Sequence, residues 1–258
     1  MDWIKYRLIY FAFSGLLLGI GIFSLIAWKM NFSIDFTGGT VIEYQKKSDG
    51  SHFTEKISST ITQEQAQRED AVITRFESVG PTFSKEIFMK TLTALIIVEL
   101  GILLWIGWQF KSFQFGISAI LATLHDTFIL IGAFSLMGHF SNAPTDTLFV
   151  TALLTTRAFS VYDTIVVFDR IRELKRKVGG NIYDLANLAV SQTMVRSLNN
   201  SLTIIFVLVA LVLLGGKTIF WFNIALLIGT ITGTYSSPFI AVPLLVTWED
   251  IKLLIKRR

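Results

Sequence analysis

The chain has 258 residues, of which 52% are hydrophobic and only 16% are charged. Soluble domains carry about a quarter of charged residues, so this composition excludes an ordinary soluble domain and favours a membrane protein. The chain has no cysteine, which excludes disulfides and thiolate metal sites, and its net charge of +4 does not by itself imply binding to nucleic acid.

Six mostly apolar runs follow one another along the chain, each about as long as the roughly 18 residues that mark a membrane-spanning helix. They cover residues 8–28, 88–108, 115–137, 147–168, 195–214 and 220–247. The first run is too long for a removed signal peptide and lacks the small-residue cleavage pattern. We therefore predict an all-α polytopic membrane protein with six transmembrane helices and a small α+β module between the first two.

Lys and Arg residues gather on one side of these spans. The connections 138–146 and 215–219 contain only Lys217, whereas the opposite ends of the spans are basic. The basic residues at those opposite ends are Lys5, Arg7, Lys111, Arg170, Arg172, Lys175, Arg176, Lys177, Lys252, Lys256, Arg257 and Arg258. The positive-inside rule then places both termini in the cytoplasm and the segment 29–87 outside.

The external segment divides the chain into residues 1–28, 29–87 and 88–258. Alternation with β-branched residues after Gly38-Gly39 predicts a strand over 40–44, and 71–76 has the pattern of a second strand. Residues 54–71 are polar and weakly helical in pattern. The cytoplasmic loop 169–194 is basic, and we expect it to form an amphipathic helix on the membrane surface, with a solvated charged turn as the alternative.

Ionisable residues inside the spans are the strongest functional signal, because a charge in hydrocarbon costs at least roughly 2.5 kcal/mol. Asp163 lies roughly 8 Å inside the cytoplasmic end of the fourth span. Helical spacing puts Ser160 and Thr164 on its face, and Arg196 begins the next span from the same side. The polar face of that next span is formed by Arg196, Asn199, Asn200 and Thr203.

From this arrangement we predict that Asp163 carries a proton and that Arg196 is its charge partner. Burial raises the pKa of a carboxyl group, and a nearby cation lowers it. A carboxyl group under both influences can load and release a proton. The alternatives are a fixed structural ion pair at Asp163 and an Arg196 that only anchors the helix end in the membrane interface.

Three further charges lie deeper in the spans. Asp126 is near the membrane midplane, where a proton-relay role and a buried hydrogen-bonded carboxyl are both open. The adjoining His125 faces about 100° away, so the two need not cooperate. Glu99 and Arg157 lie at one depth in the second and fourth spans, which predicts a compensating ion pair. The alternative is that Arg157 alters proton loading at Asp163.

The remaining patterns concern packing and exclude several chemistries. Gly229 and Gly233 form a small-residue face that predicts close helix packing, while Pro238 and Pro243 kink or end the regular helix. The scattered histidines suggest no metal site. No phosphate-loop spacing and no hydrolase or transferase constellation is visible, so we expect no enzyme activity and no cofactor.

Short stretches throughout the chain resemble the SecF family, in the family's own order. They are Asp35-Phe36-Thr37-Gly38-Gly39 within 34–40, 78–81 with Lys85-Glu86, Leu124-His125-Asp126, Ser160 with 163–173, Gln192-Thr193 with Arg196 and 201–203, and Gly229-Thr230 with 233–237. The SecF family comprises smaller subunits of the SecD–SecF auxiliary complex, related to the resistance–nodulation–division (RND) transporters.

This resemblance implies a bacterial inner-membrane subunit that pairs with SecD and uses the proton-motive force to promote preprotein translocation. The implied partners also include the SecYEG translocon, YidC, unfolded preprotein and lipid. The resemblance points to Asp163 and Arg196 as well. Two features depart from the family: the external segment looks short, and Arg157 stands where an apolar residue is usual. The alternatives are a proton-coupled small-molecule transporter and a non-transporting structural or insertase-associated subunit.

Overall fold

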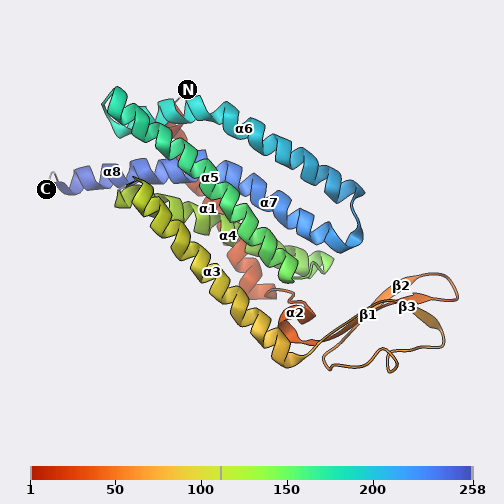
Figure 1. Ribbon diagram of the computed structural model, residues 1–258. Coiled ribbons are helices and arrows are strands. Elements are labelled where there is room, and N and C mark those ends of the chain that lie inside the picture. The colour runs from red at the N-terminus through yellow and green to blue at the C-terminus, as the bar shows by residue number, and fades with distance from the viewer. Residues whose placement is uncertain (1, 111, 257–258) are drawn as a thin grey trace.

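The structure, a computed structural model, describes residues 2–110 and 112–256 and is mostly helical (Figure 1). Lys111, Arg257 and Arg258, which contribute to the basic pattern of the sequence, lie outside the described residues. The helical elements are η1 (Ile4–Tyr6), α1 (Arg7–Trp28), α2 (Ile34–Thr37), α3 (Pro81–Phe110), α4 (Phe113–Ser141), α5 (Thr147–Lys177), α6 (Ile182–Leu214), η2 (Lys217–Ile219), α7 (Phe220–Ser236), the π-helical η3 (Ser237–Ala241) and α8 (Val242–Lys256).

Five helices in the described part of the chain are long and apolar enough to cross a membrane. They are Ile4–Trp28, Pro81–Phe110, Phe113–Ser141, Thr147–Lys177 and Ile182–Leu214. The sixth expected span, 220–247, is not one α-helix, because η3 separates α7 from α8. Pro238 lies in η3 and Pro243 in the first turn of α8, so the predicted interruption at these prolines is confirmed. The predicted helical membrane fold is confirmed, while the count of six spans stays a prediction.

Helix α5 lies at the centre of the bundle. It packs against α4, α6 and α7, while α1 packs against α4, and α3 leans along α4 and α5 (Figure 1). Apolar side chains fill two buried clusters, one that includes Phe168 and Ile171 and one that includes Phe134 and Phe149. The most apolar stretch of α3 contains no buried residue, so this helix presents much of its surface to lipid or to another chain.

The connection between α5 and α6 is a helical hairpin. α5 continues to Lys177 and α6 begins at Ile182, so the prediction of a separate surface helix within 169–194 is wrong. Gly179 and Gly180 close the hairpin with φ angles of 70° and 104°, which favour glycine. The two helix extensions bury their apolar faces in the bundle instead of on the membrane surface. The buried residues of these extensions include Ile171, Leu174, Leu185, Ala186 and Ala189.

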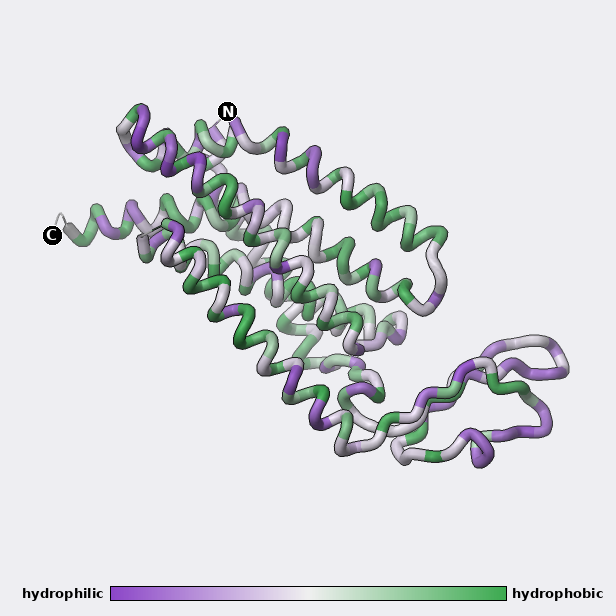
Figure 2. The backbone as a smooth tube through the Cα atoms, in the orientation of Figure 1, coloured by the Kyte–Doolittle hydropathy of each residue, from purple (hydrophilic) through white to green (hydrophobic). Residues whose placement is uncertain are grey.

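Three antiparallel strands between α2 and α3 form a sheet, in the order β2-β1-β3. They are β1 (Gly39–Lys46), β2 (His52–Ile57) and β3 (Ala71–Val79), which confirms the two predicted strands. The weakly helical reading of 54–71 is wrong, because its first residues belong to β2. Polar residues alternate along β2 with inward ones such as Phe53, which stacks on Tyr44 with 5.0 Å between ring centroids. The module is largely polar around this small core (Figure 2).

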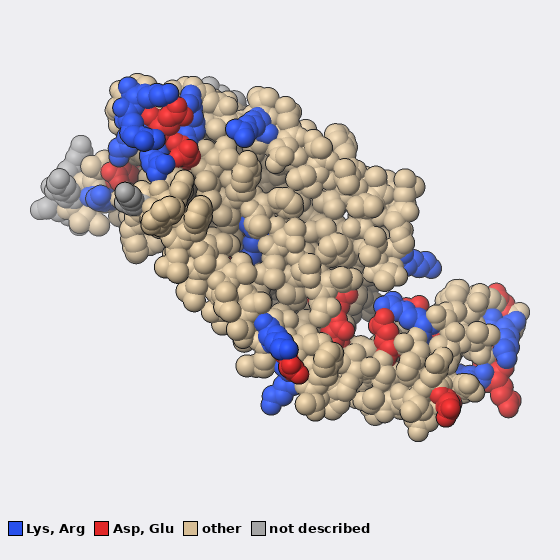
Figure 3. Space-filling model, in the orientation of Figure 1, with Lys and Arg blue, Asp and Glu red and all other residues tan. Residues whose placement is uncertain are grey.

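Both ends of the chain lie at the end of the bundle opposite the sheet (Figure 1). Arg7 of α1 forms a salt bridge of 2.7 Å with Asp250 of α8, and Trp3 donates a hydrogen bond to Ser191 of α6. Figure 3 shows charged side chains gathered toward the two ends of the molecule, with a largely uncharged belt between them. This distribution, with the long apolar helices, identifies a membrane-embedded protein.

Candidate functional site

Polar side chains from four α-helices and from η3 meet inside the bundle. This set, called here the polar core, consists of Asp126, Ser160, Asp163, Thr164, Ser197, Ser236 and Ser237. All of them except Asp163 are buried. A buried polar group is costly unless it is hydrogen-bonded, so the contacts within the polar core fix how α4, α5, α6 and α7 pack together.

Asp126 of α4 is held by side chains from two other helices and by its neighbour His125. Its Oδ2 accepts hydrogen bonds from Ser160 Oγ of α5 at 2.5 Å and from Ser236 Oγ of α7 at 2.6 Å. His125 Nδ1 lies 3.0 Å from Asp126 Oδ1, so these two neighbours, which helical spacing alone did not require to cooperate, are in contact. The two side chains leave the helix in different directions, but both are long enough to turn toward each other. Asp126 is therefore a buried carboxyl with several hydrogen-bonding neighbours.

Asp163 of α5 has fewer hydrogen-bonding neighbours than Asp126. Its Oδ2 accepts one side-chain hydrogen bond, from Ser197 Oγ of α6 at 2.6 Å. Within the described part of the chain no salt bridge reaches Asp163, so the predicted contact with Arg196 does not form. Consecutive helix residues are about 100° apart, and Ser197 occupies the direction that faces α5. Arg196 is exposed and lines an open cleft of about 460 Å³ with Asp169 and Glu173.

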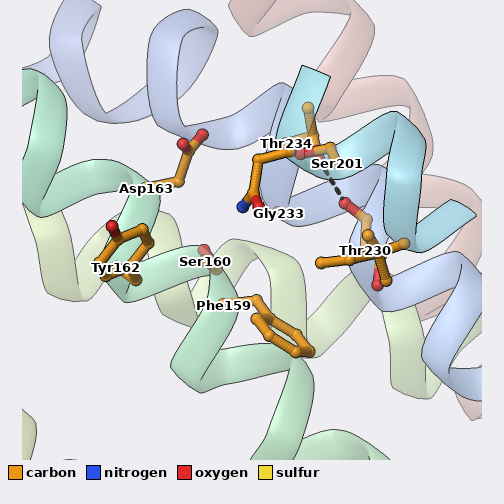
Figure 4. Close-up of a pocket in the computed structure, with 10 residues that line it drawn as sticks. Phe159, Ser160, Tyr162, Asp163, Ser201, Thr230, Gly233 and Thr234 are labelled. Atoms are coloured by element: carbon orange, nitrogen blue, oxygen red, sulfur yellow. Dashed lines mark hydrogen bonds between the residues drawn. The ribbon is translucent and has the colours of Figure 1, made fainter. Parts of the chain in front are cut away.

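A small pocket adjoins Asp163. Its volume is about 20 Å³, which is enough for one water molecule. Figure 4 shows Asp163 and Ser160 on α5 at one side of the pocket, with Ser201 of α6 and Gly233 of α7 across from them. Proton exchange between the carboxyl and a water molecule is therefore sterically feasible at this position.

The polar face predicted on α6 divides into two parts. Asn200 lines the pocket beside Asp163. Asn199 and Thr203 lie exposed on the outer surface, where Thr203 Oγ1 donates to the Asn199 carbonyl at 2.8 Å. Thr164, predicted to share a face with Asp163, lies with its Oγ1 3.0 Å from Ser237 Oγ. These hydroxyls tie α5 to the interrupted α7–η3–α8 segment.

An ion pair between Arg157 and Glu99 lies beside the polar core. Arg157 Nη1 of α5 is 2.7 Å from Glu99 Oε2 of α3, and Arg157 Nε donates to Thr127 Oγ1 of α4 at 2.8 Å. The Arg157 side chain is 7% exposed and that of Glu99 is 25% exposed. The structure thus brings together the two charges that the sequence places at one depth, and the pair fastens the peripheral α3 to the centre of the bundle.

Small residues allow α7 to approach α5 closely. A Cβ added to Gly229 would overlap the side chain of Thr156, and one added to Gly233 would lie 3.0 Å from Ser160 Cβ. This close approach is what brings Ser236 within reach of Asp126. The hydroxyl ligands Ser197, Ser236 and Ser237 were not among the predicted site residues. The available signal was the pair Ser236-Ser237 directly before a proline, because π-helical interruptions often occur at functional sites.

The glycine-containing motif forms the joint beneath the sheet. Its residues are Asp35, Phe36, Thr37, Gly38 and Gly39. Gly38 and Gly39 have φ angles of 73° and 116°, and a Cβ on Gly39 would overlap the Ile57 carbonyl of β2. Asp35 of α2 accepts two hydrogen bonds from Thr147, the first residue of α5. The motif therefore connects the strands of the sheet with the helix that carries Asp163.

Comparison with known proteins gives matches along most of the chain. Residues 58–250 match the family described as "Protein export membrane protein SecD/SecF, C-terminal", and residues 23–45 match the "SecD/SecF GG Motif". A SecF translocase subunit of Thermobaculum terrenum is 48% identical over 180 residues, covering 68% of this chain and 57% of that protein. One of Anaerolinea thermophila is 34% identical over 287 residues, covering 95% and 92% of the two chains.

Solved structures agree with these sequence matches. A crystal structure of SecDF from Thermus thermophilus, a translocon-associated membrane protein, superposes with a TM-score of 0.85 at 28% identity. The superposed region is 97% of this chain but 39% of the SecDF chain, so the present chain spans about two fifths of that larger protein. The fold, the glycine motif and the identity to relatives across nearly the whole chain together show that this chain belongs to the SecF family of protein translocase subunits.

Proposed function

We propose that this chain acts with a SecD-like partner to promote preprotein translocation across the bacterial inner membrane, using the proton-motive force. Its SecF relatives support a role in Sec-associated protein export, and the longer SecDF chains support a SecD partner. The observation that carries the proton-coupled part is Asp163, a carboxyl inside the bundle with no cationic partner among the described residues and with room for water beside it.

The two carboxyls of the polar core differ in their freedom to exchange protons. Asp126 is buried and accepts from two serine hydroxyls beside His125, so we assign it to holding the helices together. Asp163 accepts from one hydroxyl and adjoins the pocket, so it is the proposed proton carrier. One charge that crosses 100 mV releases about 2.3 kcal/mol, which is enough to bias a rearrangement of α5 between two states.

Exposed polar side chains on α6 support a partner chain in the membrane. Arg196, Asn199 and Thr203 are exposed on the surface of α6. Polar groups that face hydrocarbon without partners are unfavourable, so a second chain over this face lowers that cost. We assign this position to the SecD-like partner, and we assign α7, η3 and α8 together to a sixth membrane crossing.

In this proposal the sheet lies outside the inner membrane and both termini are cytoplasmic. The SecYEG translocon, YidC and the unfolded preprotein are the further partners, and the role is transport without an enzymatic reaction. The exposed Arg196 lines the cleft near the cytoplasmic end, where it is available to a proton pathway or to the partner chain.

This function is tested with membrane vesicles that contain the translocon and SecD, prepared with and without this chain. We expect an imposed proton gradient to stimulate preprotein export only when the chain is present, and we expect the chain to co-purify with SecD. Export without a gradient is the control for translocon content. Equal stimulation by the gradient in both kinds of vesicle would contradict the proposal.

A further inference from the structure

The carboxylate of Asp35 caps the external end of α5. Its Oδ2 accepts hydrogen bonds from the Thr147 backbone N–H at 3.0 Å and from Thr147 Oγ1 at 3.1 Å. A carboxylate at a helix N-terminus satisfies donors that lack partners within the helix and interacts favourably with the helix dipole. Asp163 lies on the same helix, roughly four turns further along. One rigid element therefore joins the glycine motif to the proposed proton carrier.

The chain just before α2 reinforces this attachment. The Ser33 N–H donates to the Thr145 carbonyl at 2.9 Å, and the Thr145 N–H donates to the Asn31 carbonyl at 2.7 Å. Asp146 accepts a hydrogen bond from another donor in the first turn of α5, the Phe149 N–H, at 2.8 Å. Burial raises the pKa of Asp146 above its usual range, against the hydrogen bond from Phe149, and the negative charge of Asp35 raises it further. Two carboxylates are thus concentrated at this one helix end.

Helix α2 and the residues just before it are also attached to the external module and to α3. Ser84 Oγ near the start of α3 donates to the Ile34 carbonyl at 3.1 Å, and Lys56 Nζ of β2 donates to the Phe32 carbonyl at 2.9 Å. Gly39 begins β1 directly after α2. Helix α5, in contrast, has no direct chain connection to the module, because α3, α4 and their loops intervene. A displacement of α5 reaches the sheet through contacts with residues 31–35 or through other helices.

We propose that Asp35 is a positioning residue that transmits displacement of α5 to the external sheet, so that proton loading at Asp163 changes the position of the sheet outside the membrane. This inference rests on the proposed function. It assigns a role to the aspartate of the glycine motif that differs from the role of the glycines. The glycines permit the turn into β1, while the aspartate links that turn to α5.

The experiment uses the full chain in complex with SecD, in vesicles under an imposed proton gradient. Because the chain has no cysteine of its own, each pair of introduced cysteines can be spin-labelled and reports one distance. The first pair, Ser51→Cys with Lys217→Cys, reports the position of the sheet against the external end of the bundle. The second pair, Lys175→Cys with Lys252→Cys, reports movement of the cytoplasmic part of α5. All four positions are exposed.

We expect the gradient to change both distances in the unsubstituted complex. With Asp35→Ala, the change in the first distance should be lost while the change in the second distance remains. Helix α5 would still move, but its movement would no longer displace the sheet. Asp35→Asn keeps one acceptor oxygen and should restore most of the response, and Thr147→Val should weaken it by removing one of the two donors. Glu64→Ala, an exposed acidic residue of the module, is the matched control and should change neither distance.

The possible failures are distinguishable. An unchanged response of the first pair in Asp35→Ala, with the second pair also responding, would overturn the transmission role of Asp35 and leave the proposed function intact. If neither pair responds in the unsubstituted complex, the proton-coupled function itself fails. Should Asp35→Ala not co-purify with SecD, the milder Thr147→Val decides: a fully normal first-pair response in Thr147→Val would count against the proposal.

Discussion

Replacing Arg157 by leucine should lower the free energy of unfolding by about 3–5 kcal/mol, because it leaves the Glu99 carboxylate inside the bundle without its cation. The Arg157 side chain is nearly fully buried, and its guanidinium contacts both Glu99 and Thr127. Replacing Glu99 and Arg157 together by leucine should cost much less, since a buried ion pair exchanged for apolar residues of similar volume is often nearly neutral. Reversible unfolding in mixed micelles measures each value.

An exposed pair on the same peripheral helix provides the control. Glu86 and Lys90 of α3 form a salt bridge of 2.6 Å with side chains that are 54% and 75% exposed. Replacing Lys90 by leucine should leave the unfolding free energy nearly unchanged, because solvent screens an exposed ion pair. Additive costs of the single substitutions at Glu99 and Arg157 would contradict the ion pair. A stable Arg157→Leu protein with altered proton coupling would favour the alternative that Arg157 acts on Asp163.

Replacing Gly132 by alanine should destabilise the protein by about 1–3 kcal/mol, the usual cost of forcing extra volume into a packed interior. The added Cβ would overlap the backbone of Gly21, where α4 crosses α1, and a backbone cannot rotate away as a side chain can. Near this crossing Ser24 Oγ donates to Ser135 Oγ at 2.9 Å, and separation of the helices would break that bond. The same unfolding measurement reports the loss.

Gly116 is the matched position on the same helix, because a Cβ added there meets no atom within 4 Å. Alanine at Gly116 should leave stability unchanged or increase it by up to about 1 kcal/mol, the difference in helix propensity. A loss of stability for Gly132→Ala together with a gain for Gly116→Ala would establish that the α1–α4 crossing requires glycine. Equal effects at both positions would mean that helix propensity alone accounts for the changes.

Much of the fold follows from patterns that are local in the sequence. The spans are visible because burial in lipid requires long apolar runs, and β1 is visible because Gly38-Gly39 precedes an alternating segment. Strand β2 escapes detection because it is a short edge strand of the sheet, and its outward residues are polar. The α5–α6 hairpin also escapes, because basic residues on its outer face mask the apolar face that packs into the bundle.

The site shows where sequence reasoning stops. Helical spacing identifies Asp163 and the depth of its neighbours, but a difference of one residue decides whether Ser197 or Arg196 faces α5. Depth also places Glu99 near Arg157, although adjacency of α3 and α5 is a tertiary property that no local pattern contains. The hydroxyls of Ser236 and Ser237 reach the polar core only because the interruption at η3 and the close approach at Gly233 orient them.

The most direct test measures preprotein export under an imposed proton gradient, comparing the unsubstituted complex with Asp163→Asn. Asparagine keeps the size of the side chain and an oxygen that accepts from Ser197, but it carries no proton at neutral pH. Asp169→Asn, on the same helix and in a salt bridge of 2.9 Å with Arg172, is the matched control. Co-purification with SecD verifies assembly of each variant. We predict that Asp163→Asn removes the gradient-dependent part of export and that Asp169→Asn retains it; full gradient dependence in an assembled Asp163→Asn complex would contradict the account.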